Sequence, residues 1–488
     1  MGINLLVLPL FIKNLGAELY GIWVLSGVVL GYLNVFDFGF TQGLQKYVAE
    51  ARVKKDDQEL SEVVITGVGL LFLIGLLLGG IFWIGAPSIV EFFNIQPESQ
   101  KVATSLLKIS ALFCVVMWPL RIVDVVLNAS MRIKELSFLN AFKTGAQSVV
   151  LLVMVLMGAD VVLIKWVTAG LIAGCSAYGL VLLKKHLPEI RWNPTHFKIN
   201  QLQRMHKFSL GMFYAAVVLM LQSRIDTLIL AKTMTVASIT SYVIAEKLFQ
   251  IVQRFSQLIT VALAPASFNI AGDARRMGVL IEESIFYRCI VATFLSSIAF
   301  FVAPDFIVLW VGAEYEETVV WARVYLCICP FISVASVPQV ARAAGGQVRL
   351  VNLFISIEMI LNVVLSIFLV SKFGVGGPIL GTVIAFFVAG PLLTSNFILK
   401  RIQVSNVWKV YRLVFPTVLV AFGIIACLDY IPFCFSGTWL GLIIKAMVGT
   451  ILVGGGLVFR VDQHLKHTSQ TGLLRLLFSF FGKKGFFK

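Results

Sequence analysis

Apolar runs of about 20 residues, separated by short segments that carry charge, make up nearly the whole chain. A helix of about 20 apolar residues is long enough to cross the hydrocarbon core of a bilayer. Only 13% of the 488 residues are charged and 59% are hydrophobic, whereas about a quarter of an ordinary soluble domain is charged. So few charges cannot cover a soluble surface of this size, and the pattern predicts an all-α polytopic membrane protein.

The apolar runs predict about 14 transmembrane helices. The expected spans are residues 1–12, 20–41, 63–90, 105–127, 139–157, 161–183, 208–230, 239–263, 285–311, 319–339, 350–370, 377–399, 413–431 and 439–459. The first run is only about 16 Å long as a helix, which is less than a bilayer requires. Either the first helix is short or the natural start lies upstream.

Lysine and arginine are distributed unevenly among the segments that connect these spans. The segments after even-numbered spans, together with the tail, contain 26 of them, and the segments after odd-numbered spans contain 4. Positive residues collect on the cytoplasmic side of membrane proteins. The imbalance therefore predicts that both termini are cytoplasmic, and it accounts for the net charge of +15 without a nucleic-acid partner.

Several classes of function are disfavoured by what the sequence lacks. It contains no G-x-x-x-x-G-K-[ST] loop, and no connecting segment is long enough for an ATPase domain. The few acids in the outer segments are typical of solvated loop charges rather than acid–base catalysts. The seven cysteines include no Cys-x-x-Cys pair and the five histidines lie in basic loops or the tail, so neither a disulfide framework nor a metal site is expected. The sequence favours a transporter over an enzyme, without a cofactor.

The expected span 239–263 carries a set of residues that we call the polar stripe. At about 100° per residue, six side chains fall on one face of the helix. They are Glu246, Lys247, Gln250, Gln253, Arg254 and Gln257. Charges inside a bilayer are expensive and mark either transport pathways or paired structural sites. The polar stripe therefore faces either an aqueous cavity or a closed network of ion pairs and amides between helices.

Other spans contain polar residues at similar depth. Asn34 and Asp37 share a face of the second span, whereas Arg224 and Asp226 point to different sides near the end of the seventh. Glu358 is an isolated carboxylate in the eleventh span. It is a candidate proton carrier, and a hydrogen-bonded core acid is the alternative interpretation.

Two blocks of sequence resemble a known family. The first reads LGAELYGIW from Leu15 and FDFGFTQGLQKYVAE from Phe36. The second reads SRIDTLILAKTMTVASITSYVIAEKLFQ from Ser223 and LAPASFNIAGD from Leu263. The chain resembles the Wzx-type polysaccharide and O-antigen flippases of the multidrug/oligosaccharidyl-lipid/polysaccharide (MOP) exporter superfamily.

The resemblance implies two six-helix lobes arranged as a V around a central cavity, followed by two more helices. Residues 1–207 would then form the N-terminal lobe, residues 208–400 the C-terminal lobe and residues 401–460 the last two helices. Residues 461–488 form a basic amphipathic cytoplasmic tail, either an interfacial helix on the inner leaflet or a solvated tail. The family also implies that helices one, two, seven and eight line the cavity, in agreement with the polar stripe.

The resemblance further implies a flippase that moves an undecaprenyl-pyrophosphate-linked oligosaccharide across the bacterial inner membrane by alternating access. The cargo would be a repeat unit of O-antigen, capsule or exopolysaccharide. The residues expected to offset the diphosphate charge are Arg254, Lys247 and Arg224. The residues expected to bond sugar hydroxyls are Gln250, Gln253, Gln257 and Asn34. The candidates for coupling to H⁺ or Na⁺ are Glu246, Glu358, Asp37 and Asp226.

Two alternatives remain. A MATE-like, cation-coupled antiporter for small molecules or drugs would favour a cavity dominated by acids, whereas the polar stripe has two cations and one acid. A membrane-embedded glycan polymerase or ligase is disfavoured by the short outer segments. The expected partners are the lipid-linked glycan, membrane lipids and other proteins of glycan assembly.

Overall fold

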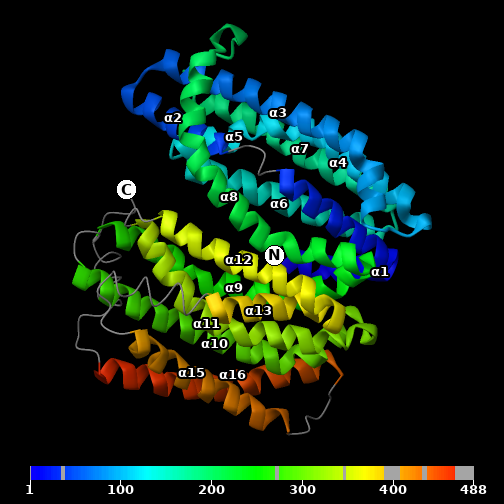
Figure 1. Cartoon of the computed structure of the whole chain (residues 1–488), viewed down its shortest axis with the longest axis vertical. Coiled ribbons are helices and arrows are strands. Elements are labelled where there is room, and N and C mark those ends of the chain that lie inside the picture. Colours follow the sequence, from blue (N-terminus) through cyan, green and yellow to red (C-terminus); the bar gives the residue numbers. More distant parts are fainter. Residues whose placement is uncertain are drawn as a thin grey trace. The chain divides into compact units, whose positions relative to one another are not determined.

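A computed structural model describes residues 2–33, 39–269, 274–344, 348–389, 407–430 and 437–467. In these ranges the regular structure consists of fifteen α-helices and two short 3₁₀ turns (Figure 1). The prediction of an all-α fold is confirmed.

The chain divides into two compact units, Met1–Thr240 and Ser241–Lys488. The first unit contains α1 (Gly2–Leu33), α2 (Phe40–Lys54), α3 (Asp57–Phe92), α4 (Pro97–Leu120), α5 (Ile122–Ala129), α6 (Ile133–Leu156), α7 (Val161–His186), η2 (Pro194–His196) and α8 (Ile199–Thr233). The second contains α10 (Ala274–Val311), η3 (Ala313–Tyr315), α11 (Thr318–Ala344), α12 (Val348–Phe373), α13 (Gly376–Ala389), α15 (Val407–Asp429) and α16 (Trp439–His467). Helix α9 (Val236–Asn269) begins in the first unit and continues in the second. The predicted lobe boundaries stay a prediction.

Many of the described helices are apolar enough to cross a membrane. Eight also have the length: Val7–Val29, Asp57–Phe92, Pro97–Ala129, Ile133–Leu156, Val161–His186, Gly278–Val311, Asn352–Phe373 and Trp439–Asp462. Three shorter apolar helices are Thr318–Ile332, Gly376–Ala389 and Val414–Asp429. The polytopic prediction is therefore confirmed.

Helix α1 is interrupted at Gly16, whose φ of 86° and ψ of 162° are not helical. Such a positive φ strains residues that carry a Cβ and favours glycine. The ring of Phe11 lies 5.4 Å from that of Tyr20 and 5.5 Å from that of Trp23. A straight helix would separate these pairs by about 14 to 18 Å along its axis. The two arms of α1 therefore bend back on each other at Gly16, between the first two expected spans.

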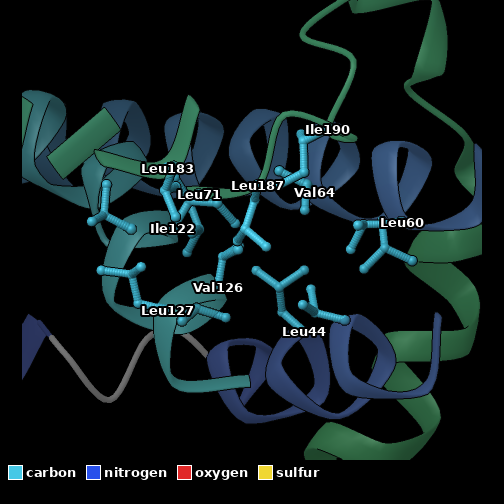
Figure 2. Packing of buried hydrophobic residues seen from close by; sticks show 14 of the residues in the cluster. Leu44, Leu60, Val64, Leu71, Ile122, Val126, Leu127, Leu183, Leu187 and Ile190 are labelled. Atoms are coloured by element: carbon cyan, nitrogen blue, oxygen red, sulfur yellow. The ribbon is translucent and has the colours of Figure 1, made fainter. Parts of the chain in front are cut away.

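The core of the first unit lies where α2, α3, α5 and α7 meet (Figure 2). Leu44 of α2 packs there with Leu60 and Leu71 of α3, and all three are almost fully buried. A Cβ placed on Gly67 would lie 2.7 Å from the methyl carbons of Leu44, so this glycine allows α2 to approach α3 closely. Residues 42–62 are expected to form a connecting segment between spans. Most of this segment is instead helical, because the apolar face of α2 packs against the core.

In the second unit, α15 and α16 lie beside α10 (Figure 1). A small apolar core joins them, with Phe301 of α10 packed against Ile425 of α15 and Val453 of α16. These three side chains are completely buried. Burying side chains of this size stabilises the arrangement by roughly 2 kcal/mol each.

Two ion pairs tie helices of this bundle together, α16 to α10 and α11 to α15. Lys445 Nζ of α16 lies 2.9 Å from Asp305 Oδ2 of α10. Arg323 Nη2 of α11 contacts both carboxylate oxygens of Asp429 in α15, at 3.1 and 3.0 Å. Each cation therefore has its own carboxylate within the bundle.

Candidate functional site

The polar stripe lies on α9, and its exposure changes along the helix. Glu246, Lys247 and Gln250 are half-buried, whereas Arg254 and Gln257 are exposed. Phe255 and Leu258, on the apolar face of α9, are exposed as well. Near Arg254, both the polar and the apolar face of the helix are therefore exposed. A charge on an exposed part of a span needs water or an anionic partner.

Neither cation of the polar stripe forms an ion pair with a carboxylate within the described part of the chain. Lys247 is influenced by two neighbouring charges of opposite sign, the carboxylate of Glu246 and the guanidinium of Arg254. A closed ion-pair network would provide a carboxylate for each cation. Around Lys247 and Arg254 the described residues give a net positive charge.

Gln253 is the most buried residue of the polar stripe, with 7% of its surface exposed. Its side chain lies beside the thiol of Cys329 of α11, with which it interacts. Tyr325 of α11 anchors this part of α9, because its hydroxyl lies 3.1 Å from that of Tyr242 and its ring stacks on Phe249 at 4.8 Å.

Arg224 of α8 is exposed and lies against Gly31 of α1. A Cβ on Gly31 would come within 2.9 Å of the Arg224 guanidinium carbon, so glycine leaves room for this cation. Asp226, two residues further along α8, is 6% exposed. The different exposure of the two residues agrees with the prediction that they point to different sides.

Two predicted site residues, Asn34 and Asp37, lie outside the described residues. Glu358 is half-buried on α12. One turn further, Asn362 Nδ2 donates to Thr382 Oγ1 of α13 at 2.9 Å, and Ser366 Oγ donates to Asn362 Oδ1 at 2.8 Å. Asn362 and Ser366 therefore join two helices, while the role of Glu358 stays a prediction.

The first unit contains a cavity of about 450 Å³ that the sequence analysis did not predict. It lies among four helices: Trp23 comes from α1, Ser110 to Trp118 from α4, Gln147 from α6, and Lys165 to Ile172 from α7. Arg121, at the junction of α4 and α5, completes the lining. This volume is typical of sites for small molecules.

Two cations in this cavity lie against aromatic rings. Lys165 Nζ donates to Ser26 Oγ at 3.2 Å and lies 4.8 Å from the centroid of the Trp23 ring. The guanidinium carbon of Arg121 lies 5.1 Å from the centroid of the Trp118 ring. Such cation–π contacts stabilise the charge without neutralising it.

Arg288 of α10 is another residue whose position the sequence did not indicate. Only 1% of its surface is exposed, and it lies near Cys329. Because it falls close to the start of an expected span, its sequence context resembles that of a charge at the membrane surface. Its burial follows from the packing of α10 against α11.

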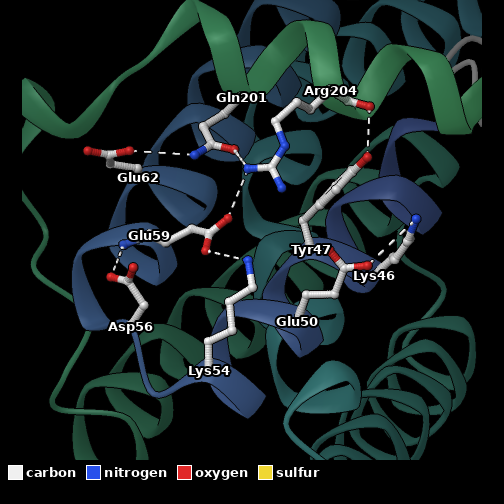
Figure 3. A network of polar contacts seen from close by, with 9 residues as sticks. All are labelled: Lys46, Tyr47, Glu50, Lys54, Asp56, Glu59, Glu62, Gln201 and Arg204. Carbon is white, nitrogen blue, oxygen red and sulfur yellow. Dashed lines mark hydrogen bonds and ion pairs between the residues drawn. The ribbon is translucent and has the colours of Figure 1, made fainter.

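A network of charged residues connects α2, α3 and the beginning of α8 (Figure 3). Glu59 accepts hydrogen bonds from Arg204 Nη1 at 2.9 Å and from Lys54 Nζ at 3.1 Å. Tyr47 Oη donates to the carbonyl oxygen of Arg204 at 3.0 Å. The hydrogen bond that Arg204 donates to the Glu59 carboxylate raises the pKa of Arg204. Each described cation here has a carboxylate, which is the pattern of a structural contact rather than of a binding site.

The sequence of this chain matches that of a known protein family. The sequence model of a family described as "Polysaccharide biosynthesis protein" matches residues 15–320. The chain belongs to this family. The resemblance to polysaccharide exporters found in the sequence is therefore confirmed. A search of curated proteins finds no matching sequence.

Solved structures share the fold. The "Lipid II flippase MurJ, inward closed conformation" superposes with a TM-score of 0.72 over 94% of this chain and 97% of its own, at 16% identity. An inward-facing MATE family multidrug resistance transporter of the MOP superfamily gives 0.70 over 83% and 95%, at 13% identity. An outward-facing structure of a MATE family transporter gives 0.58 over 83% and 92%, at 14% identity. At these identities the likeness shows the fold.

Proposed function

We propose that this protein is a flippase that moves an undecaprenyl-pyrophosphate-linked oligosaccharide across the bacterial inner membrane. The observation that carries the proposal is the net positive charge of the polar stripe on α9, where Lys247 and Arg254 have one neighbouring acid, Glu246. Membership of a polysaccharide biosynthesis family and the fold shared with a lipid II flippase support it.

The chemistry of the polar stripe suits the head of such a cargo. A diphosphate is an anion whose oxygens accept hydrogen bonds from the guanidinium of Arg254 and the ammonium of Lys247. The amides of Gln250 and Gln257 can donate to and accept from sugar hydroxyls. The polyprenyl chain, which is apolar, remains in the lipid.

Transport requires that the polar stripe is exposed alternately to the two sides of the membrane. Arg224 of α8, exposed beside Gly31, is a further candidate for contact with an anion. A proton or Na⁺ bound by a carboxylate would reset the cycle. Among the described candidates Asp226 is buried, whereas Glu246 and Glu358 are half-buried. Both termini and the network around Glu59 would face the cytoplasm.

The test uses a deletion strain complemented with variants, scored for surface polysaccharide and for intracellular lipid-linked precursor. The Lys247→Met/Arg254→Met double variant is expected to lower surface glycan to about a tenth or less and to accumulate precursor, because two charge-assisted contacts are lost. Lys372→Met, at the exposed end of α12, is the matched control and should export normally.

Full export by the double variant, at wild-type abundance in the membrane, contradicts the proposal. A strain with normal surface glycan but increased sensitivity to cationic drugs would favour the antiporter alternative. Measuring both phenotypes in the same strains separates the two functions.

A further inference from the structure

The cavity in the first unit has the composition of a binding site for an anion. Its lining residues, all from the described part of the chain, include two cations, Lys165 and Arg121, and no carboxylate. Lys165 has no carboxylate partner among the described residues. A lysine without an acid inside a membrane protein is costly unless an anion joins it.

Lys165 has hydrogen-bonding capacity to spare. An ammonium group has three donors, and within the described part of the chain one of them is used, toward Ser26. No charged group among the described residues acts on Lys165. The remaining donors are therefore available to a molecule in the cavity.

Ser110 gives a second and independent sign of a ligand. Only 3% of its surface is exposed, and its hydroxyl has no hydrogen-bond partner among the described residues. A buried hydroxyl without a partner costs roughly 1 to 3 kcal/mol. Ser110 lines the cavity together with Gln147, so both can bond a polar molecule there.

The two cations lie at different levels of the cavity, each beside a tryptophan ring. The ring of Trp166, the residue after Lys165, lies 5.7 Å from the ring of Phe113. Lys165 therefore lies at about the same height in the bundle as Phe113. Arg121 follows Phe113 by eight residues, about 12 Å along the helix. Trp23 and Trp118 provide flat apolar faces beside the two cations. The lining therefore combines charge, hydroxyl and amide groups with ring faces.

We propose that this cavity binds an anionic saccharide, either an acidic sugar or a sugar phosphate. Its anionic group contacts Lys165, its hydroxyls bond Ser110 and Gln147, and its ring lies on Trp23. Only the source of the sugar depends on the proposed function: the saccharide would be part of the glycan that the flippase transports. It assigns to the first unit a site separate from the polar stripe.

The test is the thermal midpoint of the full-length protein in phosphatidylcholine nanodiscs. A molecule that binds the folded protein raises this midpoint. The probes are glucuronate, glucose 1-phosphate, methyl glucoside and inorganic phosphate, each at the same millimolar concentration. Glucuronate and glucose 1-phosphate are expected to raise the midpoint, and methyl glucoside and inorganic phosphate to have much smaller effects.

Variants locate the binding. Lys165→Met should weaken binding of both acidic probes by about tenfold or more, because a charge-assisted bond is lost. Without ligand, its midpoint should be equal to or above that of the wild type, because an uncompensated cation has been removed. Lys165→Arg should retain binding, Ser110→Ala should weaken it about threefold, and Lys108→Met, on α4 outside the cavity, should leave it unchanged.

Three results overturn the proposal. They are an equal shift by methyl glucoside, an equal shift by inorganic phosphate, and full binding by Lys165→Met. Loss of the shift when phosphatidylglycerol is added to the nanodiscs would assign the cavity to a lipid headgroup and would also overturn it. Because no lipid-linked cargo or export is involved, failure here leaves the export result for the polar stripe unaffected.

Discussion

Two regions of the second unit hold their cations in opposite ways. In the bundle of α10, α11, α15 and α16, Lys445 is paired with Asp305 and Arg323 with Asp429. On α9, Lys247 and Arg254 have no ion pair among the described residues. The paired cations hold helices of the bundle together, whereas the cations of the polar stripe have no carboxylate partner among the described residues.

The first unit shows the same contrast over a shorter distance. Lys143 of α6 pairs with Asp124 at 3.3 Å. Lys165 of α7, which also lies in an expected span, has a serine and a tryptophan ring as neighbours. Lysines of similar sequence context therefore have different surroundings: Lys143 has a carboxylate partner, and Lys165 has none among the described residues.

The largest effect on stability is expected when a paired cation loses its acid. Asp305→Asn leaves Lys445, whose side chain is 14% exposed, without a counter-charge. The free energy of unfolding should fall by about 2 to 3 kcal/mol. Thermal or denaturant unfolding in nanodiscs measures this change. The Asp305→Asn/Lys445→Met double variant should recover most of the loss, and a double variant as unstable as the single one would refute the pairing argument.

A smaller loss is expected for the second pair, because it is more exposed. The side chains of Arg323 and Asp429 are 23% and 34% exposed, so solvent weakens their attraction. Asp429→Asn should lower the free energy of unfolding by about 1 kcal/mol. The same unfolding assay compares it with Asp305→Asn. An equal or larger loss in the free energy of unfolding for Asp429→Asn would show that solvent exposure does not determine which pair contributes more to stability.

Gly31→Ala tests the position of the Arg224 guanidinium without removing its charge. The new methyl group would lie within 2.9 Å of the Arg224 guanidinium carbon, so the side chain must move. Because the far end of a flexible side chain yields, stability should change little, whereas surface glycan should fall about threefold. Export in the complemented strain and the thermal midpoint are measured together. Unchanged export would remove Arg224 from the transport pathway.

The smallest effect on stability is expected at the polar stripe itself. Lys247→Met removes a cation without an ion pair among the described residues, so the free energy of unfolding should change by less than about 0.5 kcal/mol or rise slightly. Unfolding of this variant is compared with Asp305→Asn in the same nanodiscs. A loss of 2 kcal/mol or more at Lys247 would mean that it is a structural cation, and the contrast with Lys445 would disappear.

The fold was largely predictable because the bilayer limits the choice of structure. Apolar runs of the right length must be helical in lipid, and charged connecting segments separate them. The bend of α1 at Gly16 falls between the first two expected spans. The packing of α2 was not predictable in the same way, because it depends on Leu44 meeting Gly67 of the next helix.

The site was predictable where one helix contains it. The periodicity of α9 places Lys247 and Arg254 on one face, and this needs no knowledge of other helices. The cavity of the first unit is different, because Lys165 finds Ser26 and Trp23 across 139 or more residues. In the sequence, Lys165 resembles an anchor near the end of a span, and its position is defined by the packing of α1 against the other helices.

The most direct test measures binding of undecaprenyl diphosphate to the purified protein in phosphatidylcholine nanodiscs. The wild type and the Lys372→Met control are expected to bind it at least tenfold more tightly than the Lys247→Met/Arg254→Met variant, because the diphosphate contacts the polar stripe. Equal affinities for all three proteins would contradict the claim that α9 carries the site for the anionic head of the cargo.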